Sequence, residues 1–295
     1  MSSPCKAVVL GGQTGLLGMS LVNVLERAGC EVKATPRPAE HWMDPEALRA
    51  FFEAAEADVV FNTWAYTQVD KAEDEPSEAM RINRDLTAKV AGAATGAGAR
   101  LVHYSTDFVF NGRAERPYTE DDEPDPQCAY GRTKLAGERA LMEIAPPGLL
   151  ILRTAWLFGP GKGNFVRTML NLAAERSELT VVHDQVGSPT YTPDLAALSL
   201  DLVRAEAEGI FHVVNAGRAS WCELADEAVR CAGLSTPVRP IDSDDWPQKA
   251  ARPAFSVLDT TKFTEATGVT PRPWVQAVRE YVYGEIQGGQ ADDGE

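Results

Sequence analysis

Short apolar runs alternate with amphipathic segments along the first half of the chain. Such runs are typical of buried strands, and apolar residues that recur at helical spacing indicate helices. The predicted strands cover residues 7–10, 31–34, 59–61, 101–104 and 149–153, and the predicted helices cover 16–28, 45–56, 77–96 and 130–144. This alternation predicts an α/β fold, namely a Rossmann-type doubly wound parallel sheet with helices on both faces.

The pattern loosens in the second half of the chain. Helices are predicted at 164–176 and 193–207, a strand at 180–182, and a strand at 210–214 that returns to the main sheet. We therefore expect a Rossmann domain over 1–155 with a returning segment near 191–215. A smaller C-terminal α/β substrate domain is expected over 156–190 and 216–285. The polar, acidic residues 286–295 are expected to form a disordered tail.

A glycine-rich turn separates the first strand from the first helix, with Gly12, Gly15 and Gly18 spaced three apart. Glycines at such a turn let a pyrophosphate approach the backbone, and the amides at a helix N-terminus attract its charge. The spacing differs from G-x-G-x-x-G, but the strand–turn–helix context favours dinucleotide binding over an ordinary turn. The predicted cofactor-binding residues here are Gly12, Gln13, Thr14, Gly15, Leu16, Leu17 and Gly18.

A tyrosine and a lysine lie four residues apart in the helix predicted at 130–144. This spacing puts Tyr130 and Lys134 on one helix face. A phenol has a pKa of about 10, and a neighbouring cation lowers that pKa toward the working range. Such a pair can transfer a proton to or from an oxygen in carbonyl–alcohol chemistry. Taken alone, the pair is more simply a partly exposed helix with an extended lysine.

Hydroxyls and a carboxylate follow the predicted strand at 101–104, in the sequence Ser105-Thr106-Asp107. Ligands of open parallel sheets bind at the carboxyl ends of the strands. Thr106 is therefore expected at the mouth of the crevice, where its hydroxyl would hold a substrate carbonyl while Tyr130 delivers the proton. Combined with the glycine-rich turn, these residues predict a carbonyl-reducing site.

The residues after the second strand bear on the form of the cofactor. A carboxylate there would bind the adenosine ribose and favour NAD. The segment 32–38 instead offers Arg37 and no nearby acid, and an arginine can bind a 2′-phosphate. We therefore expect NADPH, with NADH possible and a solvated Arg37 as the simpler interpretation.

Charge and cysteine content narrow the classes of partner. The chain has 295 residues, a net charge of −15 and a sequence pI of about 4.8, so nucleic acid and anionic membranes are not expected as partners. Its five cysteines and four histidines lack metal-site spacing, so no disulfide framework or metal site is predicted. Neither a signal peptide nor a membrane-spanning run is recognisable, and a cytoplasmic protein is expected.

Seven stretches together resemble the dTDP-4-dehydrorhamnose reductase family of extended short-chain dehydrogenase/reductases. They are 65–73 (AYTQVDKAE), 105–112 (STDFVFNG), 130–138 (YGRTKLAGE), 153–156 (RTAW), 164–166 (NFV), 184–190 (DQVGSPT) and 252–259 (RPAFSVLD). The resemblance runs nearly end to end, and these motifs are more specific than the Tyr/Lys pair.

The resemblance implies NADPH-dependent reduction of the C4 keto group of dTDP-4-dehydro-L-rhamnose, for cell-surface polysaccharide synthesis. Tyr130 would protonate the new alkoxide, and Thr106 would orient the carbonyl. Lys134 would lower the phenol pKa and hold the nicotinamide ribose. In this family, the positions of Asp107 and Trp156 contact the sugar. The positions of Asn62, Ala65 and Tyr66 line the cofactor.

Four places depart from the family pattern. His41 and Trp42, also candidate cofactor-binding residues, stand where an Asp near the adenine is common. Ser20 replaces a Glu that joins a magnesium site at a dimer interface in some members, so no metal is carried over. Phe255 replaces an Asn in a substrate-contacting stretch. Trp64 replaces a small residue, and it would either narrow the cofactor cleft or pack beneath it.

Alternative functions remain open at this point. A related reductase would act on another nucleotide-linked 4-keto sugar. A non-catalytic NADP-binding subunit, resembling the regulatory subunit of methionine adenosyltransferase, would have no chemical need for an intact Thr106, Tyr130 and Lys134. An epimerase would use the same residues with tightly held NAD, which Arg37 disfavours. The expected partner is a nucleotide-sugar substrate, and the chain is expected to be a monomer or a homodimer.

Overall fold

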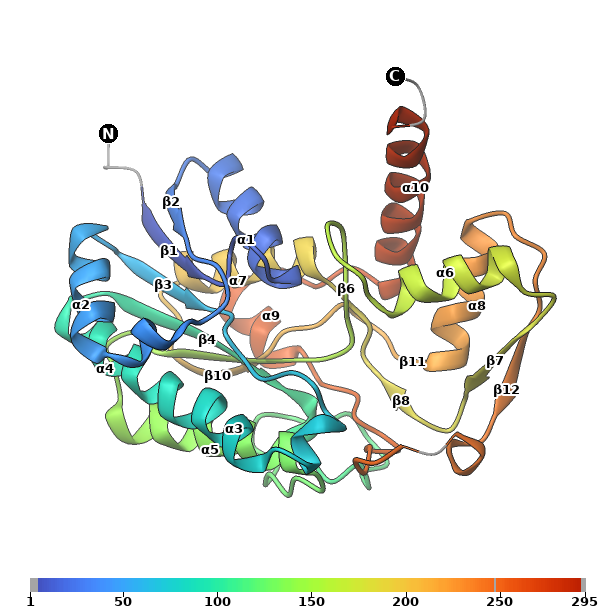
Figure 1. The fold of residues 1–295 in the computed structure, drawn as a ribbon, viewed down its shortest axis with the longest axis horizontal. Helices are drawn as coiled ribbons and strands as arrows, with labels where there is room; N and C mark the ends of the chain where they lie inside the picture. The colour runs from blue at the N-terminus through green and yellow to red at the C-terminus, as the bar shows by residue number, and fades with distance from the viewer. Residues whose placement is uncertain (1–4, 247, 293–295) are drawn as a thin grey trace.

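Six parallel strands form the central sheet of the protein (Figure 1). The structure is a computed structural model that describes residues 5–246 and 248–292, with side chains described up to residue 284. The strands are β1 (Lys6–Leu10), β2 (Glu31–Ala34), β3 (Val59–Asn62), β4 (Arg100–Thr106), β5 (Leu150–Thr154) and β10 (Gly209–His212). Their order is β10-β5-β4-β3-β1-β2, and every neighbouring pair is parallel. The predicted α/β doubly wound sheet is confirmed, and β10 is the predicted returning strand.

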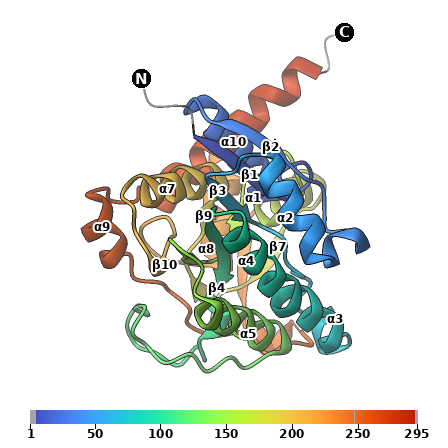
Figure 2. The same cartoon turned by 90° about the vertical axis from the view of Figure 1, so that its left-hand side faces the viewer.

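Helices cover both faces of this sheet, as Figure 2 shows in the turned view. Alternate residues of a strand point to opposite faces, so Val9 joins the core under α1 (Leu16–Arg27) and α7 (Thr192–Arg204). Val8 joins the opposite core, under α2 (Pro45–Ala54) and α4 (Thr87–Gly96). Both strand residues are fully buried, which explains why the runs read as continuously apolar.

The strand order reverses between β1 and β3. The chain leaves β1 for β2 on one side and then crosses to β3 on the other side of β1. Loops that follow β1 and β3 therefore diverge, and ligands of open parallel sheets bind in the crevice at such a switch point. The glycine-rich turn follows β1, and residues 63–66 follow β3.

The helix predicted at 77–96 is interrupted in the structure. A π-helical segment, η3 (Arg81–Leu86), separates α3 (Pro76–Met80) from α4. Asn83 lies in this segment and accepts a hydrogen bond from Tyr66 N at 2.8 Å, while it donates to Thr133 Oγ1 at 3.0 Å. Single π turns are frequent at functional sites. Here the extra residue lets one side chain connect the loop after β3 to the helix that carries Tyr130.

Short strands and helices make up a second part beside the sheet (Figure 1). Three two-stranded sheets pair β6 with β9, β7 with β12, and β8 with β11. The elements are β6 (Leu157–Phe158), α6 (Phe165–Glu175), β7 (Leu179–Val182), β8 (Val186–Gly187), β9 (Thr190–Tyr191), β11 (Ala219–Ser220), α8 (Trp221–Cys231), β12 (Val238–Ile241) and α10 (Trp274–Asp292).

Two segments differ from the expected division of the chain. Helix α9 (Thr261–Thr267) falls inside the predicted substrate domain, yet its Phe263 is buried in the core of the main sheet with α7 residues. Residues 286–292, expected to be a disordered tail, continue helix α10, and residues 293–295 lie outside the described residues. Within the described part of the chain, no helix is both long and apolar enough to cross a membrane.

Candidate active site

Helix α5 (Ala129–Ile144) carries Tyr130 at its first turn and is fixed there by two contacts. The backbone N–H of Ala129 donates to Glu73 Oε1 at 2.7 Å, which holds the helix start on the turn η2 (Lys71–Glu73). A Cβ on Gly131 would lie 2.2 Å from Phe108 O, so the close approach of α5 to the end of β4 requires glycine. The ring of Tyr130 meets Phe108 edge-on, with centroids 5.6 Å apart.

The end of strand β4 brings two predicted catalytic residues together. Thr106 Oγ1 accepts a hydrogen bond from Phe108 N at 3.2 Å and donates to Asp107 Oδ1 at 3.0 Å. Thr106 lies beside the hydroxyl of Tyr130, close enough to lower the pKa of this phenol. Thr106 and Asp107 are both at least nine-tenths buried. Thr106 therefore lies between the phenol and a buried carboxyl group, to which it donates a hydrogen bond.

The pKa of Tyr130 shifts in the direction opposite to the prediction. Burial raises this pKa, and the neighbouring Thr106 opposes the rise only in part. The amine of Lys134, expected to lower the phenol pKa, instead donates to the carbonyl oxygen of Tyr104 at 2.6 Å. Lys134 lies on the correct helix face, but its Nζ turns into the sheet. Tyr130 is therefore protonated at neutral pH, as a proton donor must be.

Lys134 is itself buried, with only 1% of its surface exposed. Burial lowers the pKa of Lys134 to about 8, although the nearby Glu138 raises it. Glu138 forms a fully buried ion pair with Arg153, which donates to Oε1 at 3.0 Å and to Oε2 at 2.7 Å. Ser105 also donates to Glu138. This pair joins α5 to β5 and β4 directly behind the predicted catalytic residues.

The glycine-rich turn fits a pyrophosphate. A Cβ on Gly18 would lie 2.4 Å from Gly11 O, and a Cβ on Gly12 would lie 2.8 Å from the Cβ of Ala34. Glycine is therefore required for close packing of α1 on β1. Helix α1 begins after Gly15 with no side-chain cap and no acid in its first turn. Its positive end is thus open to an anion.

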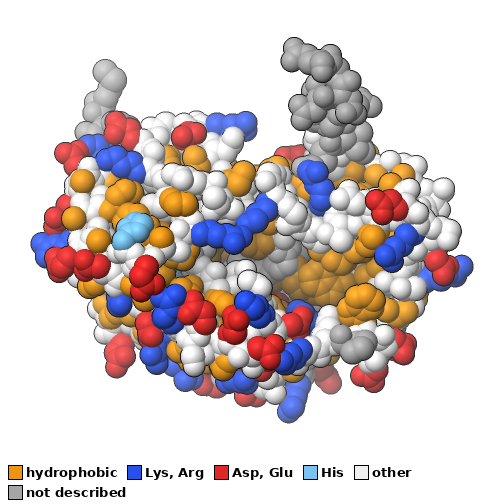
Figure 3. Space-filling model, in the orientation of Figure 1, with side chains coloured by type: hydrophobic (Ala, Val, Ile, Leu, Met, Phe, Trp, Pro, Cys, Tyr) orange, Lys and Arg blue, Asp and Glu red, His pale blue; other side chains and the backbone are white. Residues whose placement is uncertain are grey.

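A cavity of ≈ 610 Å³ borders this turn and is lined by Gln13, Thr14, Met19, Pro36, Arg37, Gly161 and Lys162. Lys162 Nζ donates to Thr14 O at 3.1 Å. Within the described part of the chain, neither Arg37 nor Lys162 is paired with a carboxylate. Figure 3 shows Lys and Arg side chains at the border of a hollow between the two parts, with hydrophobic side chains on the other wall.

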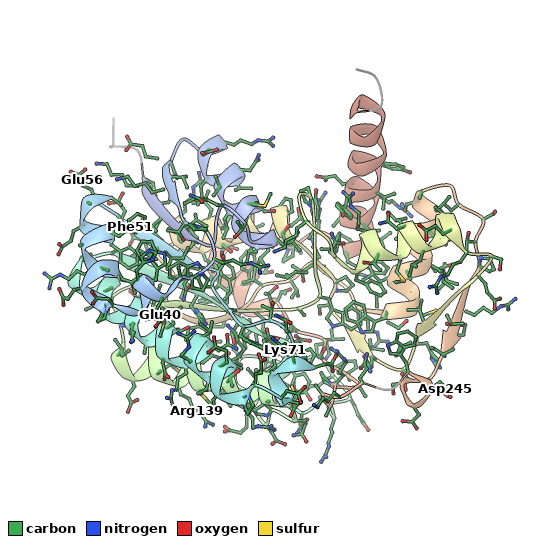
Figure 4. All side chains as sticks on the ribbon, viewed as in Figure 1. Glu40, Phe51, Glu56, Lys71, Arg139 and Asp245 are labelled. Atoms are coloured by element: carbon green, nitrogen blue, oxygen red, sulfur yellow. The ribbon has the colours of Figure 1, made fainter. Side chains whose placement is uncertain are left out.

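The predicted adenine-side residues do not line this cavity. His41 and Trp42 lie in the turn η1 (Glu40–Met43), where the Trp42 ring packs 5.2 Å from that of Phe51, labelled on α2 in Figure 4. Trp64 packs beneath the cleft and does not narrow it. Its exposed fraction is 3%, and its Nε1 donates to Pro36 O at 2.8 Å.

The other predicted cofactor-lining residues follow β3. Asn62 is buried at the end of this strand and contacts His103 in β4. Ala65 is half-buried in the same loop. The hydroxyl of Tyr66 donates to Glu75 at 2.8 Å, and burial raises the pKa of Tyr66 to about 12. The loop after β3 is therefore held by its own hydrogen bonds.

Trp156 has a strained backbone, and its ring stacks in parallel on another aromatic ring. Its φ of 48° lies in the left-handed region, which is rare for a large side chain. Its ring stacks on that of Trp221 with centroids 3.5 Å apart and an interplanar angle of 5°. A Cβ on Gly187 would lie 2.6 Å from the Trp156 ring. Trp221 opens helix α8, and its pairing with Trp156 was not predicted because 65 residues separate them.

A segment of the second part closes onto the end of β4. Asp70 accepts from Ala250 N at 3.0 Å and from Arg252 at 2.8 Å. Figure 4 shows Lys71, the next residue, on the lower side of the molecule near the second part. Burial raises the pKa of Asp107 to about 6, and the neighbouring Ser256 and the hydrogen bond from Thr106 oppose this rise. The 65–73 motif thus anchors the segment that reaches Asp107.

Comparison with known proteins decides the family. The family model described as RmlD substrate binding domain matches residues 6–285. The chain belongs to this family. It is 41% identical over 275 residues to the Bacillus subtilis spore coat polysaccharide biosynthesis protein SpsK, covering 93% of this chain and 96% of that protein.

Two further relatives carry names that describe an activity or a cofactor. The dTDP-4-dehydrorhamnose reductase of Streptomyces griseus is 41% identical over 276 residues, which is 91% of this chain and 90% of that protein. The crystal structure of the Bacillus anthracis dTDP-4-dehydrorhamnose reductase in complex with NADP has a TM-score of 0.90 at 31% identity, covering 95% of this chain and 99% of that one.

Ser20 stands where the family resemblance implied a magnesium-binding Glu in some members, and its surroundings do not suit a metal ligand. The residue is buried, and its Oγ lies 2.8 Å from Thr192 Oγ1 in the interface between α1 and α7. A hydroxyl engaged inside the subunit offers no carboxylate to a cation at a subunit surface. Among the described residues, no group of three or more acidic, His or Cys side chains could hold a metal ion.

Proposed function

We propose that this chain reduces the C4 keto group of dTDP-4-dehydro-L-rhamnose with NADPH, giving dTDP-L-rhamnose for cell-surface polysaccharide. Membership of the family supports this proposal. The observation that carries the chemistry is the placement of Thr106 beside the hydroxyl of Tyr130 at the carboxyl end of β4, where Thr106 lowers the pKa of the phenol against the effect of burial. Two hydroxyls at one point can hold and protonate a single carbonyl oxygen.

Each catalytic side chain has a distinct proposed role. A bound NADPH would supply the hydride. Thr106 holds the substrate carbonyl oxygen, and Tyr130 donates its phenolic proton to that oxygen as negative charge develops there. The raised pKa of Tyr130 suits this direction of reaction, because a protonated phenol is present at neutral pH. Lys134 stands behind Tyr130 on the same helix, within reach of the carbonyl groups of β4.

The proposed cofactor site is the cavity beside the glycine-rich turn. The open N-terminus of α1 would receive the pyrophosphate. Arg37 would bind the 2′-phosphate, and Lys162 adds a second unpaired cation to the same cavity. In a chain of net charge −15, two such cations side by side favour an anionic ligand.

The proposed substrate site lies between the two parts of the chain. Trp156 would pack against the sugar ring, and Asp107 would bind its hydroxyls. Residues 156–190 and 216–285, apart from helix α9, would form the substrate-binding part. We place the enzyme in the cytoplasm, where thiols such as Cys5 and Cys30 stay reduced.

A direct assay tests this function. dTDP-4-dehydro-L-rhamnose would be generated in situ by the enzymes that precede it, and the fall in NADPH absorbance would be followed after addition of this protein. We expect NADPH oxidation that requires both the protein and the keto sugar. Oxidation only with a different nucleotide-linked 4-keto sugar would correct the substrate, and no oxidation with any such sugar would contradict the reductase assignment.

Replacing Arg37 by Ala is expected to weaken NADPH binding roughly ten- to hundredfold and NADH binding little, because only NADPH carries the 2′-phosphate. Titration of intrinsic fluorescence with each nucleotide measures both dissociation constants. Arg27→Ala, an exposed arginine at the end of α1, is the control for loss of one positive charge. Equal losses for both nucleotides would place Arg37 away from the 2′-phosphate.

A further inference from the structure

Residues 159–163 form a glycine-rich loop of the second part that reaches the glycine-rich turn after β1. Lys162 Nζ donates to Thr14 O at 3.1 Å, although 148 residues separate the two. Gly161, with a φ of 85°, lies against Met19 near the start of α1, since a Cβ built on it would be 2.5 Å from Met19 Cε. The loop therefore brings residues of the second part to the cavity that borders the turn.

One side chain holds this loop from behind. Asn164 Nδ2 lies 2.9 Å from Gly159 O and 3.1 Å from Lys162 O, and so it spans the loop. The same nitrogen lies 2.9 Å from Tyr281 Oη in α10, while Asn164 Oδ1 caps α6 by accepting from Arg167 N at 3.1 Å. The backbone of Lys162 is thus tied to two helices of the second part, and its side chain extends from a fixed position to the turn.

The amine of Lys162 stands where a second positive charge already lies. Thr14 directly precedes Gly15, the N-cap of α1, and the N-terminus of a helix carries partial positive charge. The first turn of α1 holds no acid, and among the described side chains no carboxylate pairs with Lys162. Arg37 adds a further cation to the same cavity. Three positive groups therefore meet at one cavity, and an anion placed there is attracted by each of them.

We infer that Lys162 binds the diphosphate bridge of the dinucleotide, and that the loop 159–163 thereby holds the second part against the cofactor. The inference rests on the proposed function only for the identity of this ligand. The diphosphate belongs at the N-terminus of α1, beside Thr14, whereas Arg37 follows β2 and faces the 2′-phosphate. When the nucleotide binds, the Lys162 amine exchanges a neutral carbonyl for a charged phosphate oxygen, which is the stronger acceptor.

The two cations predict different patterns of nucleotide affinity. NADPH and NADH share the diphosphate, so Lys162→Ala should weaken both roughly tenfold and to the same extent, whereas Arg37→Ala should weaken NADPH alone. Lys162→Arg keeps the charge and should retain most of the affinity. Fluorescence titration with each nucleotide measures these dissociation constants, and circular dichroism checks that each variant is folded.

Lys33→Ala is the matched control for this variant. Lys33 is an exposed lysine of β2 that also donates to a backbone carbonyl, Ala54 O at 2.9 Å, and it does not line the cavity. Its loss should change neither dissociation constant. Unchanged affinities in a folded Lys162→Ala protein, or a loss confined to NADPH, would overturn the inference.

Lysine acetylation read by mass spectrometry tests the same contact without a variant or a sugar. Lys162 and Lys33 are both exposed in the free protein, so acetic anhydride should label both. Saturating NADPH or NADH should slow the labelling of Lys162 several-fold and leave Lys33 unchanged. If both nucleotides bind and Lys162 stays as reactive as before, the inference is wrong while the reductase proposal stands. Protection of Lys162 in a protein that reduces no keto sugar would support the inference and contradict the reductase proposal.

Discussion

Replacing Tyr130 by Phe is expected to lower turnover of the keto sugar by about 10²–10⁴-fold, the usual contribution of a general acid. The ring and its edge-on contact with Phe108 remain, and only the proton donor is lost. NADPH affinity should therefore stay nearly unchanged. Steady-state kcat for the keto sugar and the dissociation constant of NADPH from fluorescence titration measure the two effects separately.

Tyr104→Phe is the matched control for this prediction. It removes the same hydroxyl from a buried tyrosine of β4, but that hydroxyl donates to Ser199 Oγ at 2.9 Å, on the side of the sheet covered by α7. Its kcat should stay close to that of the wild type. If Tyr130→Phe kept the wild-type rate, another group would be the acid, and the phenol beside Thr106 would have only a structural role.

Much of the fold could be predicted because its signals are local. Strands β1, β3, β4 and β5 are largely buried apolar runs, and the flanking helices place apolar residues in the two cores, so most elements from 7 to 155 can be predicted one by one. The π segment at Arg81–Leu86 leaves no such signal, because its apolar residues fit one continuous helix. Residues 261–267 were assigned to the substrate domain with the rest of 216–285, because only tertiary contact shows which core receives Phe263.

The site was predictable where spacing along one element fixes geometry. The glycine-rich turn lies between β1 and α1, and Tyr130 and Lys134 lie on one helix, because each of these placements follows from a local pattern. The direction in which the Lys134 side chain points could not be predicted from the sequence, because it depends on a carbonyl group and a histidine of strand β4. Lys162 was missed for the same reason: 148 residues separate it from Thr14.

The buried pair Glu138–Arg153 was also not predicted, and breaking it should have the largest effect on stability. Glu138→Gln leaves the Arg153 guanidinium buried, with 2% of its side chain exposed, and without its counter-charge. We expect the free energy of unfolding to fall by about 3–5 kcal/mol, the usual cost of removing one partner of a buried ion pair. Chemical denaturation followed by circular dichroism measures this loss.

Two comparison variants separate charge from packing in this result. Glu53→Gln breaks an exposed pair with Arg49, whose side chains are 49% and 48% exposed, and should cost less than about 1 kcal/mol. The double variant Glu138→Leu, Arg153→Met removes both charges and keeps similar volume, so it should regain most of the stability lost in Glu138→Gln. A double variant as unstable as the single one would show that the geometry of the pair, and the hydrogen bond it receives from Ser105, holds α5 against the sheet. Tyr130 would then depend on that ion pair for its position, and the double variant would lose turnover as well as stability.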